Sequence, residues 1–180
     1  RCKTTMLHPA EHSLLGKQTR YKSRYDASLL FAIERRVKWE QFGLDGSQLP
    51  YLGVDIWTAY ELSWLLPSGK PVVAMAEVEV PADSPNIIES KSFKLYLNSF
   101  NQSVFADTHA VCSLMEHDLS AVAGAAVRVR MLDLDQATAQ GLAVLPGACI
   151  DGLEIDIGQY HEPDAGLLQA SEQVAHEQLH

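Results

Sequence analysis

The chain has 180 residues, of which 47% are hydrophobic and 21% are charged, a composition typical of folded globular proteins. Its formal net charge of −9 and pI near 5.1 disfavour contact with the phosphate backbone of DNA or tRNA, so we expect a small-molecule ligand and no direct nucleic acid partner. No stretch approaches the roughly 20 consecutive apolar residues that cross a bilayer, and we expect no membrane association.

The cysteines argue against a disulfide framework. Cys2, Cys112 and Cys149 are odd in number and widely spaced, which is typical of a protein from a reducing cytoplasm. Cys112 and His117 are five residues apart, a spacing unsuited to ligands on one helical face, so we predict no metal site. The amino terminus has no apolar segment behind its positive charges, and we expect no secretion signal.

The order of patterns along the chain divides it into three parts. Residues 1–24 are polar and without a sustained period, which predicts an amino-terminal arm. Residues 25–160 carry the periodic segments and form the predicted folded module. Residues 161–180 begin with a break at Pro163 and Gly166 and predict a linker with a short helix.

Two strands are predicted first. The segment 53–66 is rich in β-branched and aromatic residues, and the segment 71–80 alternates small apolar residues with others, so the intervening turn at Pro67 to Lys70 makes them an antiparallel hairpin. The first strand carries Trp57, Tyr60 and Trp64. These rings could form a stacking platform for bases, but packing in a core or an interface is the expected role, because aromatic residues in strands usually fill cores.

An amphipathic helix is predicted over residues 86–102. Its apolar face carries Phe93, Leu97 and Phe100, and a second face carries Lys91, Lys94 and Asn98. Because Ser84-Pro85-Asn86 is typical of a helix entry, we expect the helix to begin near Ile87 or Ile88. Glu89 and Ser90 would then lie in its first turn, where free N–H groups attract polar or anionic ligands.

A second helix is predicted from about Asp107 to Ala123, with Asp107 or Thr108 as N-cap and Gly124 at its end. Its expected solvent face carries His109, Glu116, His117 and Asp118. Strands are predicted at 126–135 and 153–157. The resulting β-β-α-α-β-β order favours an α+β fold whose antiparallel sheet is covered by two helices on one face.

The run Glu89 to Ser99, ESKSFKLYLNS, resembles the diagnostic motif of the 7-cyano-7-deazaguanine reductases, the NADPH-dependent nitrile reductases of queuosine biosynthesis, a tRNA modification pathway. Three further segments look like the amino-terminal half of the long, two-module members: 25–30, 55–65 and 149–151. The β-β-α-α-β-β order is also that of the tunnelling fold, to which this family belongs. The resemblance covers about residues 13–180.

The resemblance implies a reaction and a set of binding residues. Family members reduce the nitrile of 7-cyano-7-deazaguanine to 7-aminomethyl-7-deazaguanine through a covalent thioimide on a cysteine, with two hydrides from NADPH. It assigns Ile88, Glu89 and Ser90 to the deazaguanine, with Glu89 accepting hydrogen bonds from the N–H edge of the base. It assigns Ser90, Lys91 and Lys94 to NADPH.

The resemblance places the nucleophilic cysteine and the proton-donating aspartate in a second module, beyond a point similar to residues 172–180 of this chain. Cys2, Cys112 and Cys149 have no matching context, so no catalytic residue is assigned here. We therefore expect this polypeptide to be inactive alone and to pair with a second tunnelling-fold module and with further copies of itself.

Two other interpretations remain open. The chain could be a non-catalytic module of the same fold that binds or assembles through its sheet edges. A pterin-type cyclohydrolase is a third possibility, but it needs a metal site or a histidine-rich pocket that the cysteine and histidine spacing does not provide.

Overall fold

The structure is a computed structural model that describes residues 22–133 together with residues 135, 149, 152, 154 and 158. The chain divides into two units, and all the described helices and strands belong to the first, Arg1–Leu142. A short 3-10 turn, Ala27–Leu29, precedes them. The elements are β1 (Ala32–Glu34), α1 (Arg36–Gln41), β2 (Val54–Leu65), β3 (Pro71–Pro81), β4 (Asn86–Ile88), α2 (Ser90–Asn98), α3 (Thr108–Ala123) and β5 (Arg128–Leu132).

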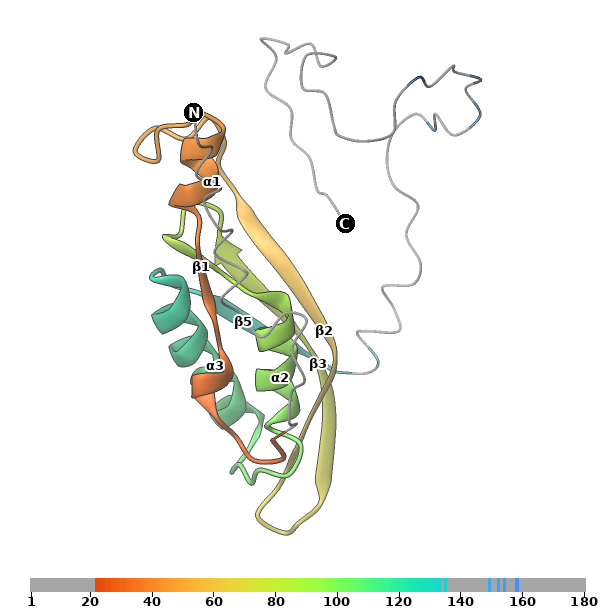
Figure 1. Ribbon diagram of the computed structural model, residues 1–180. Coiled ribbons are helices and arrows are strands. Elements are labelled where there is room, and N and C mark those ends of the chain that lie inside the picture. Colours follow the sequence, from red (N-terminus) through yellow and green to blue (C-terminus); the bar gives the residue numbers. More distant parts are fainter. Residues whose placement is uncertain are drawn as a thin grey trace. The chain divides into compact units, whose positions relative to one another are not determined.

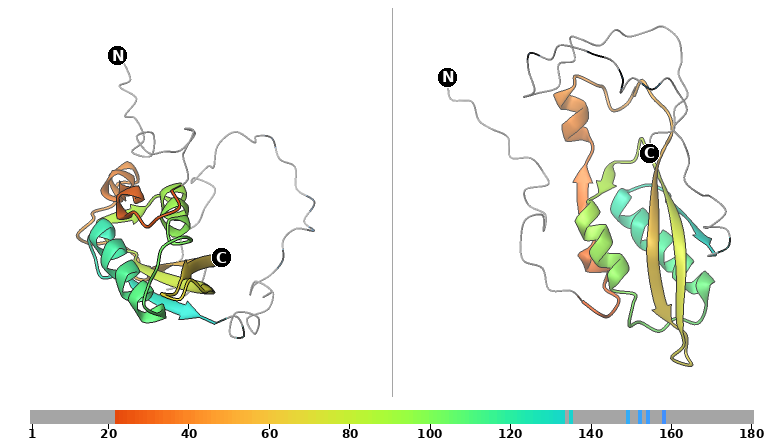
Figure 2. Two further views of the ribbon diagram at one scale, coloured as in Figure 1. Left: turned by 90° about the horizontal axis from the view of Figure 1, so that it is seen from below. Right: turned by 90° about the vertical axis from the view of Figure 1, so that its right-hand side faces the viewer.

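The main layer is an antiparallel sheet of three strands in the order β2-β3-β5. Helices α2 and α3 cover one face of this sheet, and a smaller antiparallel pair, β1 with β4, lies beside the helices (Figures 1 and 2). This arrangement confirms the predicted α+β class and the covering of one sheet face by two helices. The largest side chains buried between sheet and helices are Trp64, Tyr96, Phe100, Leu62, Met115 and Leu119.

The predicted hairpin is confirmed, but β2 contains an irregularity that its sequence pattern does not reveal. Ala59 pairs with Ala76 and Leu62 pairs with Ala74, so β2 has one residue more than β3 between these pairs. Such a bulge moves the inward-facing positions from odd to even residues. Ala59 before it and Leu62 and Trp64 after it are therefore all buried, while Tyr60 within it is 71% exposed.

The prediction that the central helix begins near Ile87 or Ile88 is wrong. Both residues belong to β4, where Ile87 pairs with Ile33 and Ile88 with Ala32, and α2 begins at Ser90. The helix also ends at Asn98, earlier than the predicted Gln102. Neither β1, β4 nor α1 was predicted, because strands of three residues and a helix of six are too short to show a period.

Helix α3 begins and ends as predicted. The Asp107 side chain accepts from the Ala110 N–H at 2.8 Å, and Gly124 closes the helix in the left-handed conformation with φ 71°. The predicted third strand is confirmed as β5, whereas the predicted strand 153–157 falls almost wholly outside the described residues. The arm 1–24 and the segment 161–180 also lie outside them, except for residues 22–24.

The prediction that Asp118 lies on the solvent face of α3 is wrong. Asp118 is 8% exposed, and its Oδ2 accepts the Tyr25 hydroxyl at 2.7 Å and the Tyr96 hydroxyl at 2.8 Å. The carboxylate therefore joins the segment before β1 to α2 and α3. Glu116 is also engaged, because its Oε1 accepts the Val129 N–H of β5 at 3.0 Å, whereas His109 and His117 are exposed as predicted.

The tyrosine pair predicts an alkaline sensitivity. Burial, followed by the hydrogen bond to Asp118, raises the pKa of Tyr96 above its ordinary value of 10.0. Above pH 10, Tyr96 ionises in the unfolded chain but stays protonated in the folded one, which favours the unfolded state. The folded state therefore has its full stability below pH 10 and loses stability as the pH rises above 10. We expect the free energy of unfolding to fall above pH 10 by up to about 1.4 kcal/mol per pH unit for Tyr96.

Urea denaturation of the chain between pH 8 and pH 11 measures this slope. Tyr96→Phe should flatten it, and Tyr60→Phe, which alters an exposed tyrosine, should not. Equal slopes in all three proteins would contradict the assignment.

Candidate substrate site at the start of helix α2

The site predicted from the motif lies where β4 passes into α2. Glu89 is the N-cap of α2, with an extended backbone at φ −68° and ψ 129°. Its Oε1 accepts the Lys91 N–H at 2.9 Å, and its Oε2 accepts the Ser92 N–H at 2.7 Å. The Glu89 carboxylate therefore lies at the N-terminal end of the helix, one position before the first turn in which it was predicted, and satisfies two of the N–H groups that a helix start leaves free.

The Glu89 main chain is held by a cycle of hydrogen bonds with Phe31. The Phe31 N–H donates to Ser92 Oγ at 3.0 Å, Ser92 Oγ donates to the Glu89 carbonyl at 2.7 Å, and the Glu89 N–H donates to the Phe31 carbonyl at 2.9 Å. The β1–β4 pairing continues directly from this cycle. Both polar main-chain groups of Glu89 and both of its carboxylate oxygens are thus engaged.

The Glu89 carboxylate keeps acceptor capacity for a ligand. Two carboxylate oxygens offer about four acceptor positions, and the two N–H groups use one on each oxygen. Glu89 is only 4% exposed, so a hydrogen bond to its carboxylate would be shielded from water. A charged acceptor in such surroundings binds N–H donors strongly and rejects groups that cannot donate.

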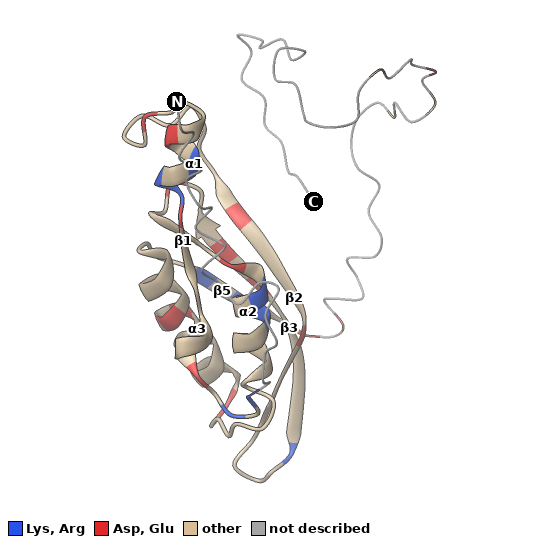
Figure 3. Ribbon diagram, in the orientation of Figure 1, with Lys and Arg blue, Asp and Glu red and all other residues tan. Residues whose placement is uncertain are grey.

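The other motif residues are placed differently from one another. Ser90 and Lys94 are exposed one helical turn apart on the same side of α2, and Lys91 is half-buried beside them. Lys and Arg residues occur on α2 and β5, whereas Asp and Glu residues occur on β2 and β3 (Figure 3). Ile88 is 2% exposed and packs in the core, so only its main chain remains for contact with a base.

Arg35 anchors β4 to the main sheet. Its N–H donates to the Pro85 carbonyl at 3.0 Å, and its Nε donates to Ser84 Oγ at 3.1 Å. Its guanidinium forms an ion pair with Asp55 of β2, and the Arg35 side chain is only 13% exposed. The strand that leads into Glu89 is therefore fixed on both sides, by Phe31 and by Arg35.

Cys112 lacks the features of an activated nucleophile. Cys112 Sγ donates to the Val129 carbonyl at 3.1 Å, and burial, followed by the charge of Glu116, raises the pKa of its thiol. A raised pKa reduces the thiolate fraction on which nucleophilic attack depends. Cys149 is exposed, and Cys2 lies outside the described residues.

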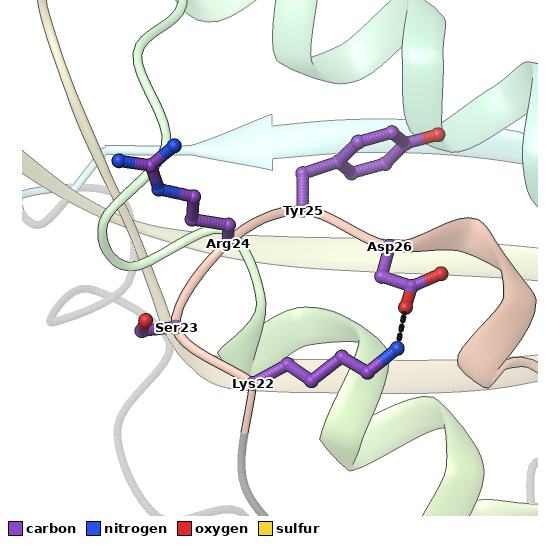
Figure 4. Close-up of a pocket in the computed structure, with 5 residues that line it drawn as sticks. All are labelled: Lys22, Ser23, Arg24, Tyr25 and Asp26. Carbon is purple, nitrogen blue, oxygen red and sulfur yellow. Dashed lines mark hydrogen bonds and ion pairs between the residues drawn. The ribbon is translucent and has the colours of Figure 1, made fainter.

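A hollow of about 430 Å³ is lined by residues 22–26 (Figure 4). Lys22 and Asp26 point toward one another across it and form an ion pair, while the Tyr25 ring points away from them. Hydrogen bonds from Lys22 and then from Ser28 lower the pKa of Asp26. The hollow lies near the C-terminal end of α2, because the Asp26 N–H donates to Ser99, and it does not include Glu89.

Two further observations concern the described part of the chain. Nowhere in it do three histidine, cysteine, aspartate or glutamate side chains gather closely enough to hold a metal ion. Within the same residues, no helix has the length and apolar character needed to cross a bilayer.

Sequence reasoning identified Glu89 but missed the residues that hold it. Phe31 acts through its main chain and leaves no signature in its side chain. Ser92 was recognisable in principle, because Glu89 and Ser92 have the spacing of a capping box with the two residue types exchanged. The Glu89 carboxylate accepts from the Ser92 N–H, and the Ser92 hydroxyl returns to the Glu89 carbonyl.

Comparison with known protein families gives one match. The family model described as "Nitrile reductase, 7-cyano-7-deazaguanine-reductase N-term" matches residues 21–131, which is more than half of the chain. The matched segment contains every described helix and all but the last residue of β5. The tunnelling fold expected from the motif is thereby confirmed.

Proposed function

Because this chain belongs to the family of amino-terminal modules of the 7-cyano-7-deazaguanine reductases, which are nitrile reductases of queuosine biosynthesis, we propose that it holds the deazaguanine base through Glu89. The observation that supports this most strongly is the buried Glu89 carboxylate. Its position is fixed by two main-chain N–H groups, and each oxygen keeps an acceptor position that neither of these N–H groups uses.

The chemistry of the base suits this carboxylate. A guanine-like ring presents a ring N–H and an exocyclic amino group side by side, and a carboxylate accepts both in parallel. An adenine-like ring presents an acceptor at the corresponding position, which would face the negative charge without a hydrogen bond. We propose that Ser90 and the Ile88 main chain complete the contact with the base.

We assign the exposed side of α2 to NADPH. Lys91 lies in the first turn of α2 and Lys94 in the middle of the helix, and the positive charge of a lysine suits a phosphate group. Ser90, exposed one turn before Lys94, offers a hydroxyl on the same side. These residues fit the phosphates of a dinucleotide, and when bound NADPH would supply hydride for reduction of the nitrile.

We further propose that the nucleophile comes from a second tunnelling-fold module. Neither described cysteine has a matching sequence context, and the raised thiol pKa of Cys112 opposes nucleophilic attack. β2 is an edge strand of the described sheet, and its open hydrogen-bonding groups favour association with the second module or with further copies. We place this assembly in the cytoplasm.

Isothermal titration with 7-cyano-7-deazaguanine tests the base contact. We expect Glu89→Gln to weaken binding about 10- to 100-fold, because an amide removes the charge and one acceptor from the pair of hydrogen bonds. Glu61→Gln is the matched control, since Glu61 is an exposed carboxylate on β2, and should bind like the unaltered chain.

Equal affinity of the Glu89→Gln and Glu61→Gln variants would contradict the contact. The second candidate function, a non-catalytic assembly module, predicts no binding of the nitrile by any variant together with stable oligomers in sedimentation experiments.

An assay of NADPH oxidation in the presence of the nitrile tests the missing nucleophile. We expect the chain alone to give no turnover above the background without protein, because none of its three cysteines has a sequence context that matches the family's nucleophile. Turnover comparable to that of a two-module reductase measured in parallel would show that the chain carries its own nucleophile.

A further inference from the structure

Three serines attach the segment that precedes β1 to α2 and the turn after it. Ser92, Ser99 and Ser103 each accept a main-chain N–H from this segment, donated by Phe31, Asp26 and Tyr25 at 3.0, 3.2 and 2.7 Å. Each hydroxyl also donates to a main-chain carbonyl, those of Glu89, Tyr96 and Ser99, at 2.7, 2.6 and 3.0 Å. We call these residues the serine ladder.

The three serines of the ladder differ in the residues to which their hydroxyls connect the segment before β1. Ser99 and Ser103 connect main-chain groups at the C-terminal end of α2, away from the proposed base contact. Ser92 alone in the ladder reaches Glu89, through the hydroxyl bond to its carbonyl and through its own N–H to Oε2. Ser92 and Ser99 are both 0% exposed, so they have equal burial and different neighbours.

We propose that Ser92 is a positioning residue for the deazaguanine contact, acting through Glu89. This inference rests on the proposed function, because it gives Glu89 its role toward the base. The Ser92 hydroxyl holds the Glu89 peptide group against Phe31 and thereby sets the direction in which the carboxylate leaves the main chain. The segment Tyr25–Phe31 is then part of the site, although none of its side chains need touch the ligand.

The Ser92→Ala substitution separates positioning from helix capping. Alanine keeps the main-chain N–H that donates to Glu89 Oε2, so the cap donor remains. It removes the hydroxyl, and with it the acceptor for the Phe31 N–H and one of the two donors to the Glu89 carbonyl, which keeps the Phe93 N–H at 2.9 Å. The Glu89 N–H also keeps its bond to the Phe31 carbonyl, so the Glu89 main chain is held less tightly but not released. We expect the carboxylate to lose part of the fixed geometry that two parallel hydrogen bonds to a base require.

The first test needs no ligand. Amide hydrogen exchange is measured by NMR at Lys91, whose N–H donates to Glu89 Oε1, in the unaltered chain and in the Ser92→Ala and Ser99→Ala variants. We expect exchange at Lys91 to accelerate about tenfold in Ser92→Ala, the equivalent of one lost hydrogen bond, and to stay unchanged in Ser99→Ala. Ser92→Cys, which keeps a weaker donor and acceptor of similar size, should fall between them.

The second test is titration of the same proteins with 7-cyano-7-deazaguanine. We expect Ser92→Ala to raise the Kd about tenfold and Ser99→Ala to change it less than twofold, even where both lower the melting temperature equally. In a Glu89→Gln background, Ser92→Ala should cause no further loss, because its effect passes through the carboxylate.

Equal losses of affinity in Ser92→Ala and Ser99→Ala would overturn the proposal and make the serine ladder a general support of the fold. So would unchanged exchange at Lys91 in Ser92→Ala. If the unaltered chain does not bind the nitrile, the proposed function fails separately, and the exchange rate at Lys91 still decides whether Ser92 fixes the carboxylate.

Discussion

The arrangement at the start of α2 depends on a constraint of electrostatics: a carboxylate that is 4% exposed must have its oxygens hydrogen-bonded, or its burial becomes too costly. Glu89 meets this constraint with the first free N–H groups of α2. β4 must therefore end at Ile88 and the helix must begin at Ser90, because only the N-cap position points a side chain back at those groups. Phe31 and Ser92 then fix the peptide that carries the carboxylate.

We propose that this geometry makes one side of a binding site. The first N–H groups of α2 hold the Glu89 carboxylate, Arg35 and Phe31 hold the strand that leads to it, and α2 carries Lys91 and Lys94. Cys112 Sγ contacts the Val129 carbonyl and none of these residues, and the raised pKa of its thiol opposes nucleophilic attack. We therefore propose a division of labour in which this module recognises the base and a second module supplies the covalent chemistry.

The overall negative charge of the chain agrees with that division. A net charge of −9 opposes long stretches of nucleic acid backbone, whereas two lysines on one helix suffice for the few phosphates of a dinucleotide. The ligand that we propose is a free base, and a module that binds a free base needs no surface for tRNA. The acidic side chains of β2 and β3 are therefore compatible with the function that we propose.

Much of the fold could be predicted from sequence, because the β2–β3 hairpin and α3 carry strong local signals: alternation, a turn, an N-cap at Asp107 and a closing Gly124. The bulge at Tyr60 could not be predicted from the sequence of β2, because it arises from the pairing of β2 with β3. The three-residue strands β1 and β4 show no period and exist through their mutual pairing. Asp118 looked like a surface residue because its two tyrosine partners are distant in sequence.

The site was predicted as a set of residues but not as a geometry. The motif identified Glu89, and the spacing of Ser92 to Glu89 was a further signal. The contacts of Phe31 and Ser99 could not be predicted, because they join main-chain groups to hydroxyls that are distant in sequence. The resemblance assigned Ile88 to the base as well, but it did not reveal that the Ile88 side chain is buried.

A structure of the chain with 7-cyano-7-deazaguanine bound, by crystallography or by NMR with intermolecular contacts, is the decisive test of the Glu89 contact. We expect the ring N–H and the exocyclic amino group of the base to lie within hydrogen-bond distance of the two Glu89 oxygens, which keep their bonds to the Lys91 and Ser92 N–H groups. A base bound elsewhere, for example in the hollow lined by Lys22 to Asp26, with Glu89 untouched, would contradict it.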